Sequence, residues 1–166
     1  MVVIIPARAP EDFDAFRSLV RDFANWAMST FNPGATELPP VLARMEQELA
    51  DLPGKYADPD GAIFVASVDG TVAGCIAGFR YDPTSIEVTR LWVRPACRGH
   101  RVGEALVAQL LNTAQAAGYR RAVLRSRQEM TSAHRIYRTA GFVDADGPEL
   151  FPTFNEFEVA MTRDLA

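Results

Sequence analysis

The sequence predicts a mixed α+β fold, in which helices flank one twisted and mostly antiparallel sheet. Three consecutive strand-like segments joined by short turns occupy the middle of the chain. Segments with helical periodicity lie before and after them, and the chain closes with a further alternating segment. This succession is typical of helices packed on the faces of a single sheet.

The first third begins with a short apolar strand, Val2 to Pro6. Apolar residues then recur at helical spacing until Asn32-Pro33-Gly34 interrupts the pattern. These residues are Phe13, Phe16, Leu19, Val20, Phe23, Ala24 and Ala27. A second helix is expected from Pro39 to about Leu52, because prolines are tolerated in a first turn and Pro53-Gly54 would end it.

The middle third changes to the periodicity of strands. Ala62 to Val68 is rich in β-forming residues, Asp69-Gly70 is a strong hairpin signal, and Thr71 to Tyr81 is the expected return strand. Asp82-Pro83 then turns the chain into a third strand, Ile86 to Val93. Strands joined by such short turns predict an antiparallel meander.

The last third returns to helical spacing, with a helix that ends at Gly118, a typical residue just past a helix end. Its buried face is predicted to contain Val102, Leu106, Leu110, Ala114 and Ala117. The remaining elements are expected to be a strand from Arg121 to Arg125, a helix from Thr131 or Ser132 to before Gly141, an extended piece at Phe142-Val143, and a strand from Phe154 to Met161.

Length and composition indicate one globular domain over residues 1–166, with 48% hydrophobic and 23% charged residues. The net charge of −4 argues against nucleic acid as a partner, because phosphate binding needs a surplus of Lys and Arg. No apolar stretch resembles a signal peptide or a membrane span, so we expect a cytoplasmic protein without a membrane partner. Cys75 and Cys97 lack metal-ligand spacing, so we expect free thiols and no metal.

The most informative segment runs from Leu91 to Gly103, where a strand leads through a Pro- and Gly-containing loop into a helix N-terminus. The first turn of a helix has unpaired N–H groups and a positive dipole end, which suit a phosphate group. Arg98 and Arg101 add positive charge there. The spacing fits neither a Walker loop nor the dinucleotide fingerprint. A purely structural turn, with Gly99 and Gly103 relieving steric strain, explains the glycines equally well.

The segment nevertheless resembles the pyrophosphate loop of the GNAT N-acetyltransferase superfamily. That signature is Arg or Gln, two residues, Gly, one residue, then Gly or Ala; Arg98 and Gly103 occupy its ends, and Arg101 stands in place of the usual Gly. The segment Ala133 to Phe142 is similar to a second signature of the family, Ala-x-x-x-Tyr-x-x-x-Gly-Phe. The similarity covers roughly residues 50 to 145.

The resemblance implies a GNAT-like fold, in which the strand before the loop and the strand around Ala122-Val123-Leu124 splay apart to admit CoA. It also implies acetyl-CoA as the cosubstrate and direct attack by a primary amine, without a covalent acyl-enzyme. The residues implied in binding acetyl-CoA are Leu91 and Val93 through their main chains, and Arg98, Gly99, His100, Arg101, Val102 and Gly103 in the loop.

By the same resemblance, Tyr137 is the general acid that protonates the departing CoA thiolate. Helical spacing places Tyr137 on one face with Ala133, Ile136 and Ala140, which should point inward. An aromatic ring can pack there while its hydroxyl reaches a polar ligand. The alternative is a tyrosine that only packs and hydrogen-bonds to the backbone.

Glu87 is the candidate general base. Strict alternation would place it with Thr89, Leu91 and Val93 on one side of its strand, opposite Ile86, Val88, Arg90 and Trp92. Some GNAT enzymes use an acidic residue at about this position, and partial burial would raise the pKa of Glu87 toward neutrality. A salt bridge from Glu87 to Arg90 or to another arginine is an equally good interpretation.

Other residues carry weaker expectations. His134 is expected on the solvent-exposed face of its helix, and Arg125 and Arg127 either hold an acidic acceptor or are solvated. In the family the acceptor site draws on the first two helices and their connection, which here means roughly Phe31 to Tyr56, and on a later loop, here Asp146 to Asn155. Four aromatic residues either wall such a pocket or belong to the core, namely Phe31, Tyr56, Phe151 and Phe154.

Three functions therefore compete. The first is acetyl transfer to a small-molecule or peptide amine, which the sequence does not identify; the second is a non-catalytic acyl-CoA-binding regulatory module. The third, nucleotide binding through the same loop, lacks a Mg²⁺-binding constellation. A homodimer is common in the superfamily.

Overall fold

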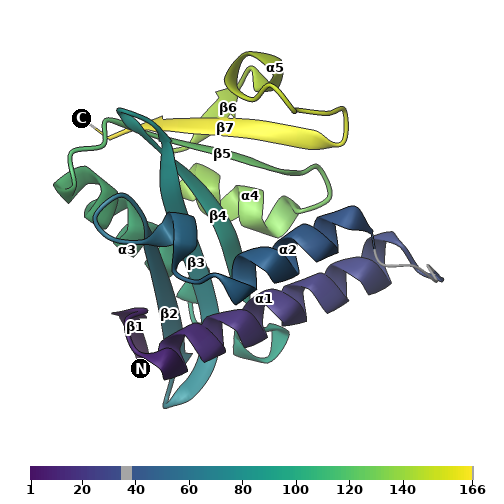
Figure 1. Ribbon diagram of the computed structural model, residues 1–166, viewed down its shortest axis with the longest axis vertical. Coiled ribbons are helices and arrows are strands. Elements are labelled where there is room, and N and C mark those ends of the chain that lie inside the picture. The colour runs from purple at the N-terminus through teal and green to yellow at the C-terminus, as the bar shows by residue number, and fades with distance from the viewer. Residues whose placement is uncertain (35–38, 166) are drawn as a thin grey trace.

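The computed structural model describes residues 1–34 and 39–165. Their strands form one seven-stranded sheet in the order β1-β2-β3-β4-β5-β7-β6 (Figure 1). All neighbouring strands are antiparallel except β4 and β5, so the predicted mixed and mostly antiparallel sheet is confirmed. The strands are β1 (Val2–Pro6), β2 (Ala62–Val68), β3 (Thr71–Asp82), β4 (Ser85–Val93), β5 (Arg121–Arg127), β6 (Val143–Ala145) and β7 (Glu158–Asp164).

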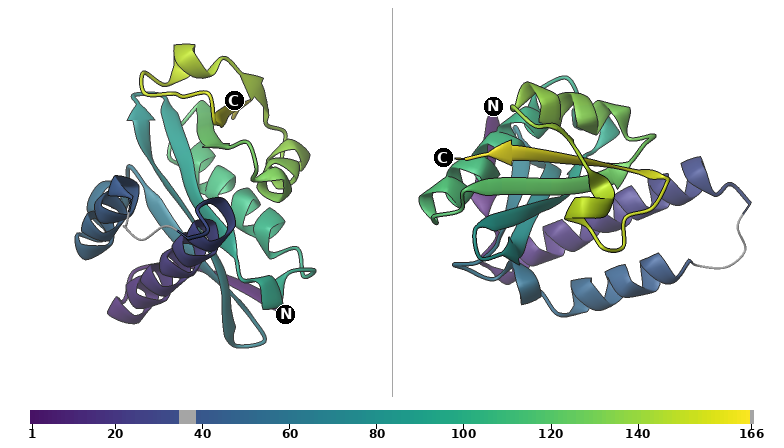
Figure 2. Two further views of the ribbon diagram at one scale, coloured as in Figure 1. Left: turned by 90° about the vertical axis from the view of Figure 1, so that its right-hand side faces the viewer. Right: turned by 90° about the horizontal axis from the view of Figure 1, so that it is seen from above.

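Helices cover both faces of the sheet (Figure 2). One face carries α1 (Pro10–Phe31) and α2 (Pro40–Ala50), and the other carries α3 (Val102–Ala116) and α4 (Thr131–Thr139). A short helix, α5 (Gly147–Leu150), precedes β7 and was not expected from the sequence. Within residues 1–34 and 39–165, no helix has both the length and the apolar composition that crossing a bilayer requires.

The first helix starts three residues before the apolar pattern that predicts it. Pro10 takes its first position, where the missing N–H costs nothing. Asp12 accepts hydrogen bonds from the N–H groups of Arg8 and Ala9 at 3.0 and 2.9 Å. A carboxylate at this end also interacts favourably with the helix dipole, so the local chemistry fixes where α1 begins.

The predicted hairpin between β2 and β3 is confirmed. Asp69 and Gly70 have φ angles of 49° and 84°, the left-handed values that two-residue hairpin turns of the primed type need. At the next turn, the side chain of Asp82 accepts the N–H of Thr84 at 2.9 Å, and β4 follows at Ser85. The meander therefore delivers β4 to the middle of the sheet.

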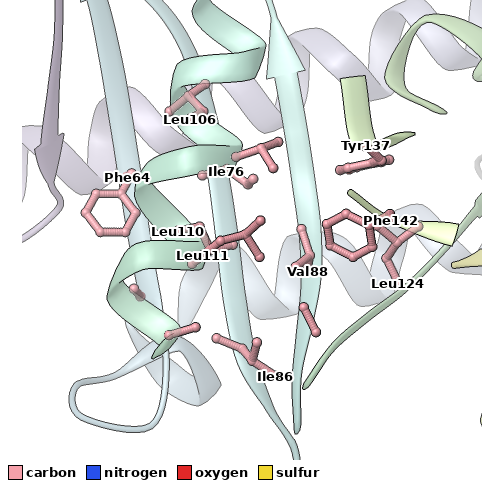
Figure 3. Packing of buried hydrophobic residues seen from close by; sticks show 14 of the residues in the cluster. Phe64, Ile76, Ile86, Val88, Leu106, Leu110, Leu111, Leu124, Tyr137 and Phe142 are labelled. Atoms are coloured by element: carbon pink, nitrogen blue, oxygen red, sulfur yellow. The ribbon is translucent and has the colours of Figure 1, made fainter. Parts of the chain in front are cut away.

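The core on the α3 face follows the predicted helical pattern. Leu106 and Leu110 are fully buried and lie beside Phe64 and Ile76 of the sheet (Figure 3). Ala117, predicted on the buried face, instead lies exposed just past the helix end, because α3 stops one residue earlier. This packing fixes α3, and with it the loop that precedes the helix, against β4.

The last strand begins later than predicted, at Glu158 and not at Phe154. The side chain of Asn155 accepts the N–H of Phe157 at 2.9 Å, and its carbonyl accepts the N–H of Glu158 at 3.2 Å. Such a turn, closed by an Asn side chain, competes with strand pairing. The strand then continues to Asp164 between β5 and β6.

β4 and β5 pair over only three positions before they diverge (Figure 1). Residues 85–87 of β4 pair with residues 121–123 of β5, and beyond them each strand keeps only its other neighbour, β3 or β7. The predicted splaying of these two strands is confirmed. It opens the sheet beside the loop that connects β4 to α3.

Candidate active site

A bulge in β4 lies where the two central strands separate. Cys75 pairs with Trp92 and Ala77 with Thr89, so two β4 residues, 90 and 91, stand opposite a single β3 residue. Arg90 has a φ of 60°, a left-handed value that is uncommon for a residue with a side chain. Such a bulge kinks its strand and redirects the residues that follow.

The bulge corrects the predicted alternation of β4. Leu91 and Val93 pack on the α3 face together with Ile86 and Val88, whereas Trp92 lies in the core beneath α1. Strict alternation placed Leu91 and Val93 with Glu87 instead, and Trp92 with Ile86. That expectation was wrong because one extra residue in the strand exchanges the two faces.

An ion-pair cluster supports the bulge from α2. Glu48 accepts hydrogen bonds from Nε and Nη2 of Arg90 at 3.1 and 2.6 Å, and a further one from the hydroxyl of Tyr56. Lys55 Nζ lies 3.2 Å from the same carboxylate. Burial acts to raise the pKa of Glu48, but Arg90, Tyr56 and Lys55 together lower it below its ordinary value. The carboxylate is therefore ionised and holds Arg90 in place.

The loop after β4 reaches α3 through a short 3-10 helix, η2 (Pro95–Cys97). Gly99 has a φ of 93° and Arg101 a φ of 57°. Arg101, which replaces the usual loop Gly of the resembled signature, thus keeps the left-handed backbone that Gly favours. In the described part of the chain, the N–H groups of residues 99–104 have no hydrogen-bond acceptor. They stand at the positive end of the α3 dipole, which suits an anion.

Two hollows meet at the β4 bulge. The first, the loop hollow, has about 380 Å³ and lies between the Arg98–Gly103 loop and α4. The second, the helix hollow, has about 540 Å³ and lies between α1, α2, β4 and the end of β5. Leu91, Trp92, Met130 and Ala133 line both, so the two hollows adjoin across the bulge. An extended ligand held at the loop can reach the helix hollow.

Tyr137 lines the helix hollow from the inward face of α4. Its side chain is buried, with 5% exposed, and its ring packs edge-on against Phe142 at a centroid distance of 5.6 Å (Figure 3). Its hydroxyl makes no hydrogen bond to the described residues, although it is not one of their fully buried unpaired polar atoms. Burial raises the pKa of the phenol, which therefore stays protonated.

Glu87 is half-buried on the α1–α2 face of β4, between Phe79 of β3 and Val123 of β5. Burial raises its pKa, while Arg125 and Lys55 oppose the shift and Glu158 adds to it. Glu87 forms no ion pair with Arg90, which binds Glu48. It does not line the helix hollow, so the two candidate catalytic side chains do not share one cavity wall.

His134 is buried, with 4% exposed, contrary to the prediction of an exposed helical side chain. Its Nε2 lies 3.0 Å from Oγ of Ser126 on β5. This hydrogen bond offsets part of the free-energy cost of removing the polar ring from water. Ser126 lines the helix hollow and was missed by sequence reasoning. For burial of His134 the sequence did contain a signal. His134 lies three residues before Tyr137, so the two side chains lie near the same helix face.

The helix hollow is lined by many apolar side chains and by several charged ones. Phe31 and Asn155 line it, whereas Tyr56 and Phe151 are core residues and Phe154 packs against the latter. Residues 35–38 of the predicted acceptor segment lie outside the described residues. The charged lining residues include Arg125, Arg127 and Glu158. Arg125 pairs with Glu158 at 3.8 Å, and Arg127 pairs with Glu129 at 3.1 Å.

Neither cysteine belongs to a disulfide, as expected. Cys75 is buried beneath α1, and burial raises the pKa of its thiol to about 12, which keeps it protonated. A protonated thiol is a poor nucleophile. Groups of three or more His, Cys, Asp or Glu side chains arranged to hold a metal ion do not occur in the part of the chain that the structure describes.

Comparison with known proteins agrees with this architecture. Residues 20–142, more than half of the chain, match the model of the acetyltransferase (GNAT) family. An uncharacterised N-acetyltransferase of Schizosaccharomyces pombe is 31% identical over 143 residues, which are 85% of this chain and 82% of the relative.

Solved structures share the fold at low sequence identity. A GNAT-family acetyltransferase from Staphylococcus aureus superposes with a TM-score of 0.80 at 16% identity, over 100% of both chains. A PaiA N-acetyltransferase of Thermoplasma acidophilum, solved in complex with coenzyme A, gives a TM-score of 0.78 at 16% identity over 99% of both chains. The splayed strands and the loop at the α3 N-terminus agree with this fold, and the match to the family model together with the Schizosaccharomyces pombe relative shows that the chain belongs to the GNAT acetyltransferase family.

Proposed function

We propose that this chain, as one domain over residues 1–166, transfers an acetyl group from acetyl-CoA to a primary amine by direct attack in a ternary complex. The observation that carries the proposal is the meeting of two hollows at the β4 bulge. Unpaired loop amides lie beside one hollow and Tyr137 lines the other. Membership of the family supplies the acyl donor class.

The loop residues would hold the pyrophosphate of acetyl-CoA. Gly99, His100, Val102 and Gly103 would donate main-chain N–H groups, which suit phosphate oxygens at a helix N-terminus. Arg98 and Arg101 would add positive charge, and Arg101 keeps its own N–H donor. The fit is supported by the left-handed φ angles of Gly99 and Arg101, because turns that contain left-handed residues can gather successive N–H groups into an anion-binding concavity.

The bulge would receive the arm that carries the thioester. Leu91 and Val93 would offer main-chain groups to the amides of that arm, because β4 lacks a neighbour on its β5 side beyond residue 87. An N–H donor fixed at this point would also stabilise the oxyanion that forms when the thioester carbonyl is attacked.

Tyr137 would act as the general acid that protonates the leaving thiolate. Its raised pKa keeps the proton on the phenol at neutral pH, where a thiolate is basic enough to accept it during C–S cleavage. Glu87 is the carboxylate that the family resemblance offers as proton acceptor. Its raised pKa suits that role, but it would act through water, because it does not line the helix hollow.

The acceptor would be a small-molecule or peptide amine with an apolar body. Two of the exposed large apolar side chains, Val41 and Phe157, lie at the helix hollow, where such a body would cover them. The proposed setting is the cytoplasm, where acetyl-CoA is available, and a homodimer is compatible with the proposal.

A panel of amines incubated with the protein and acetyl-CoA tests the function, with release of free CoA as the readout. Turnover that depends on an amine supports acetyl transfer. Binding of acetyl-CoA without turnover across amino acids, polyamines, aromatic amines and peptide N-termini favours the alternative, a non-catalytic acyl-CoA-binding module. Thermal stabilisation by ATP at least equal to that by acetyl-CoA would contradict both.

A further inference from the structure

The pair of Ser126 and His134 joins β5 to α4 beside the helix hollow. The His134 ring is buried, and Nε2 makes its hydrogen bond to Oγ of Ser126 at 3.0 Å. Ser126 lines the helix hollow, whereas His134 does not. Of these two residues, Ser126 is therefore the one that an amine in that hollow can contact.

The same helix carries the candidate general acid. His134 and Tyr137 are three residues apart on α4, so their side chains lie on neighbouring positions of one face. Tyr137 also lines the helix hollow. One helix thus brings a proton donor and, through Ser126, a potential proton acceptor to the same cavity.

The surroundings of His134 favour the neutral imidazole. Burial and Arg138 of its own helix lower its pKa, while hydrogen bonding to the Arg127 backbone of β5 and the charge of Asp144 on β6 oppose the shift. Arg138 and Asp144 pair with each other at 3.1 Å, and Arg127 pairs with Glu129. A neutral imidazole has one ring nitrogen free to accept a proton.

We propose that Ser126 and His134 form a proton relay for the acceptor amine. As the amine nitrogen bonds to the thioester carbon, Ser126 Oγ takes one N–H proton and its own hydroxyl proton passes to Nε2 of His134. Tyr137 supplies the proton that the sulfur takes when the C–S bond breaks. Transfer of one proton from the imidazolium to the phenolate through water restores both groups, so amine and acetyl-CoA give amide and CoA.

This inference rests on the proposed acetyl transfer and competes with Glu87 for one step of it. Ser126 touches the amine in this scheme, and His134 acts through Ser126. The rival interpretation is structural, in which the hydrogen bond only ties α4 to β5. The two interpretations differ in what happens when the bond is kept but the basic nitrogen is lost.

Four variants separate them, with steady-state kinetics as a function of pH for the best amine of the panel. His134→Gln keeps a group that can hydrogen-bond to Ser126 but cannot take a proton, and Ser126→Ala removes the hydroxyl. Both should lower kcat by about 100-fold, the usual scale of general base catalysis, and abolish the acid limb of kcat/KM. Ser126→Thr keeps a hydroxyl and should retain most of the turnover. Ser67→Ala, a half-buried serine of β2 outside both hollows, is the matched control.

A titration independent of turnover completes the test. The chain has two histidines, so the ring signals of His134 are identified in NMR spectra by their loss in His134→Gln. The relay requires that the His134 ring titrates with the same midpoint as the acid limb of kcat/KM in the wild-type protein.

The outcomes are distinct. An unchanged kcat and an unchanged acid limb in His134→Gln overturn the relay, and so does a His134 midpoint that differs from the acid limb. If the wild-type protein acetylates no amine, the proposed function fails instead. If the wild-type protein acetylates an amine and only Glu87→Gln removes the acid limb of kcat/KM, the relay is overturned and Glu87 is the base.

Discussion

Glu48 of α2 and Arg90 of β4 form a two-fold hydrogen-bonded ion pair, with Oε2 of the carboxylate 3.1 and 2.6 Å from Nε and Nη2 of the guanidinium. Their side chains are only 15% and 23% exposed. The pair joins residues 42 positions apart in the sequence. It therefore couples α2, which lines the helix hollow, to the left-handed residue of the β4 bulge.

Glu48→Gln should lower the free energy of unfolding at pH 7 by about 3 kcal/mol, because it leaves the largely buried Arg90 without a counter-charge. Denaturation by urea measures the loss. The pKa of Glu48 is depressed in the folded protein, so the contribution of this carboxylate is complete above its ordinary pKa and is lost as the pH falls through the lower folded-state value. Glu46→Gln is the matched control, since Glu46 pairs with Arg21 at the surface, where water and salt screen the ion pair, so this variant should be much less destabilised. Equal losses in the two variants would contradict the assignment.

Tyr137→Phe should lower kcat by about 100-fold or more and leave the affinity for acetyl-CoA unchanged, because the ring keeps its packing and only the proton donor is lost. Calorimetric titration with acetyl-CoA and steady-state turnover measure the two quantities. Tyr119→Phe is the control, since Tyr119 is buried but its hydroxyl donates to the carbonyl of Asp60, away from both hollows. That variant should lose about 1 kcal/mol of stability and keep its turnover. Undiminished turnover in Tyr137→Phe would remove the phenol from the mechanism.

Arg101→Gly should stabilise the fold by up to about 1 kcal/mol. A left-handed φ costs a side-chain-bearing residue roughly 1–2 kcal/mol, which Gly would avoid. Because Gly loses more conformational entropy on folding, the net stabilisation is smaller than this strain. The same variant should bind acetyl-CoA more weakly at low salt, and the difference should shrink as ionic strength rises. Arg101→Ala removes the same charge without easing the backbone, so it should share the loss of affinity but not the gain in melting temperature. A gain of equal size in both variants would show that the conformation of residue 101 is not strained.

Glu87→Gln should raise the free energy of unfolding above that of the wild-type protein by more at pH 7 than at pH 4. The pKa of Glu87 is raised in the folded state, so its contribution is favourable below the ordinary value of 4.5 and is lost as the pH rises through the higher folded-state pKa. The neutral amide avoids this loss. Denaturant titrations of both proteins at several pH values measure the difference, which should grow with pH; a constant difference would mean that Glu87 has its ordinary pKa.

Periodicity in the sequence was sufficient to predict the helices and strands that bury only one face. The spacing of Leu106 and Leu110 predicted α3, and Asp69-Gly70 predicted the hairpin, because each pattern reports a local physical requirement. The splaying of β4 from β5 came only from family resemblance. Nothing in either strand taken alone specifies where their pairing ends.

The bulge could not be predicted, because no local residue marks it. Arg90 is neither Gly nor Asn, and its left-handed backbone is accompanied by contacts to Glu48 that depend on the tertiary fold. Because the bulge adds one residue to β4, Leu91, Trp92 and Val93 lie on the opposite faces of the sheet from those predicted. For His134 the spacing from Tyr137 was a local signal, but its hydrogen bond could not be predicted, because its partner Ser126 belongs to another element.

The short β4–β5 pairing also gives the sheet two interior edges in addition to β1 and β6. Backbone amides that point into this wedge lack the cross-strand protection of the amides on either side of it. Their deuterium uptake should be among the fastest in the sheet, although they lie at the centre of the molecule. Backbone pairing is thus incomplete in the middle of the sheet, where an extended ligand chain can supply the missing hydrogen-bond partners.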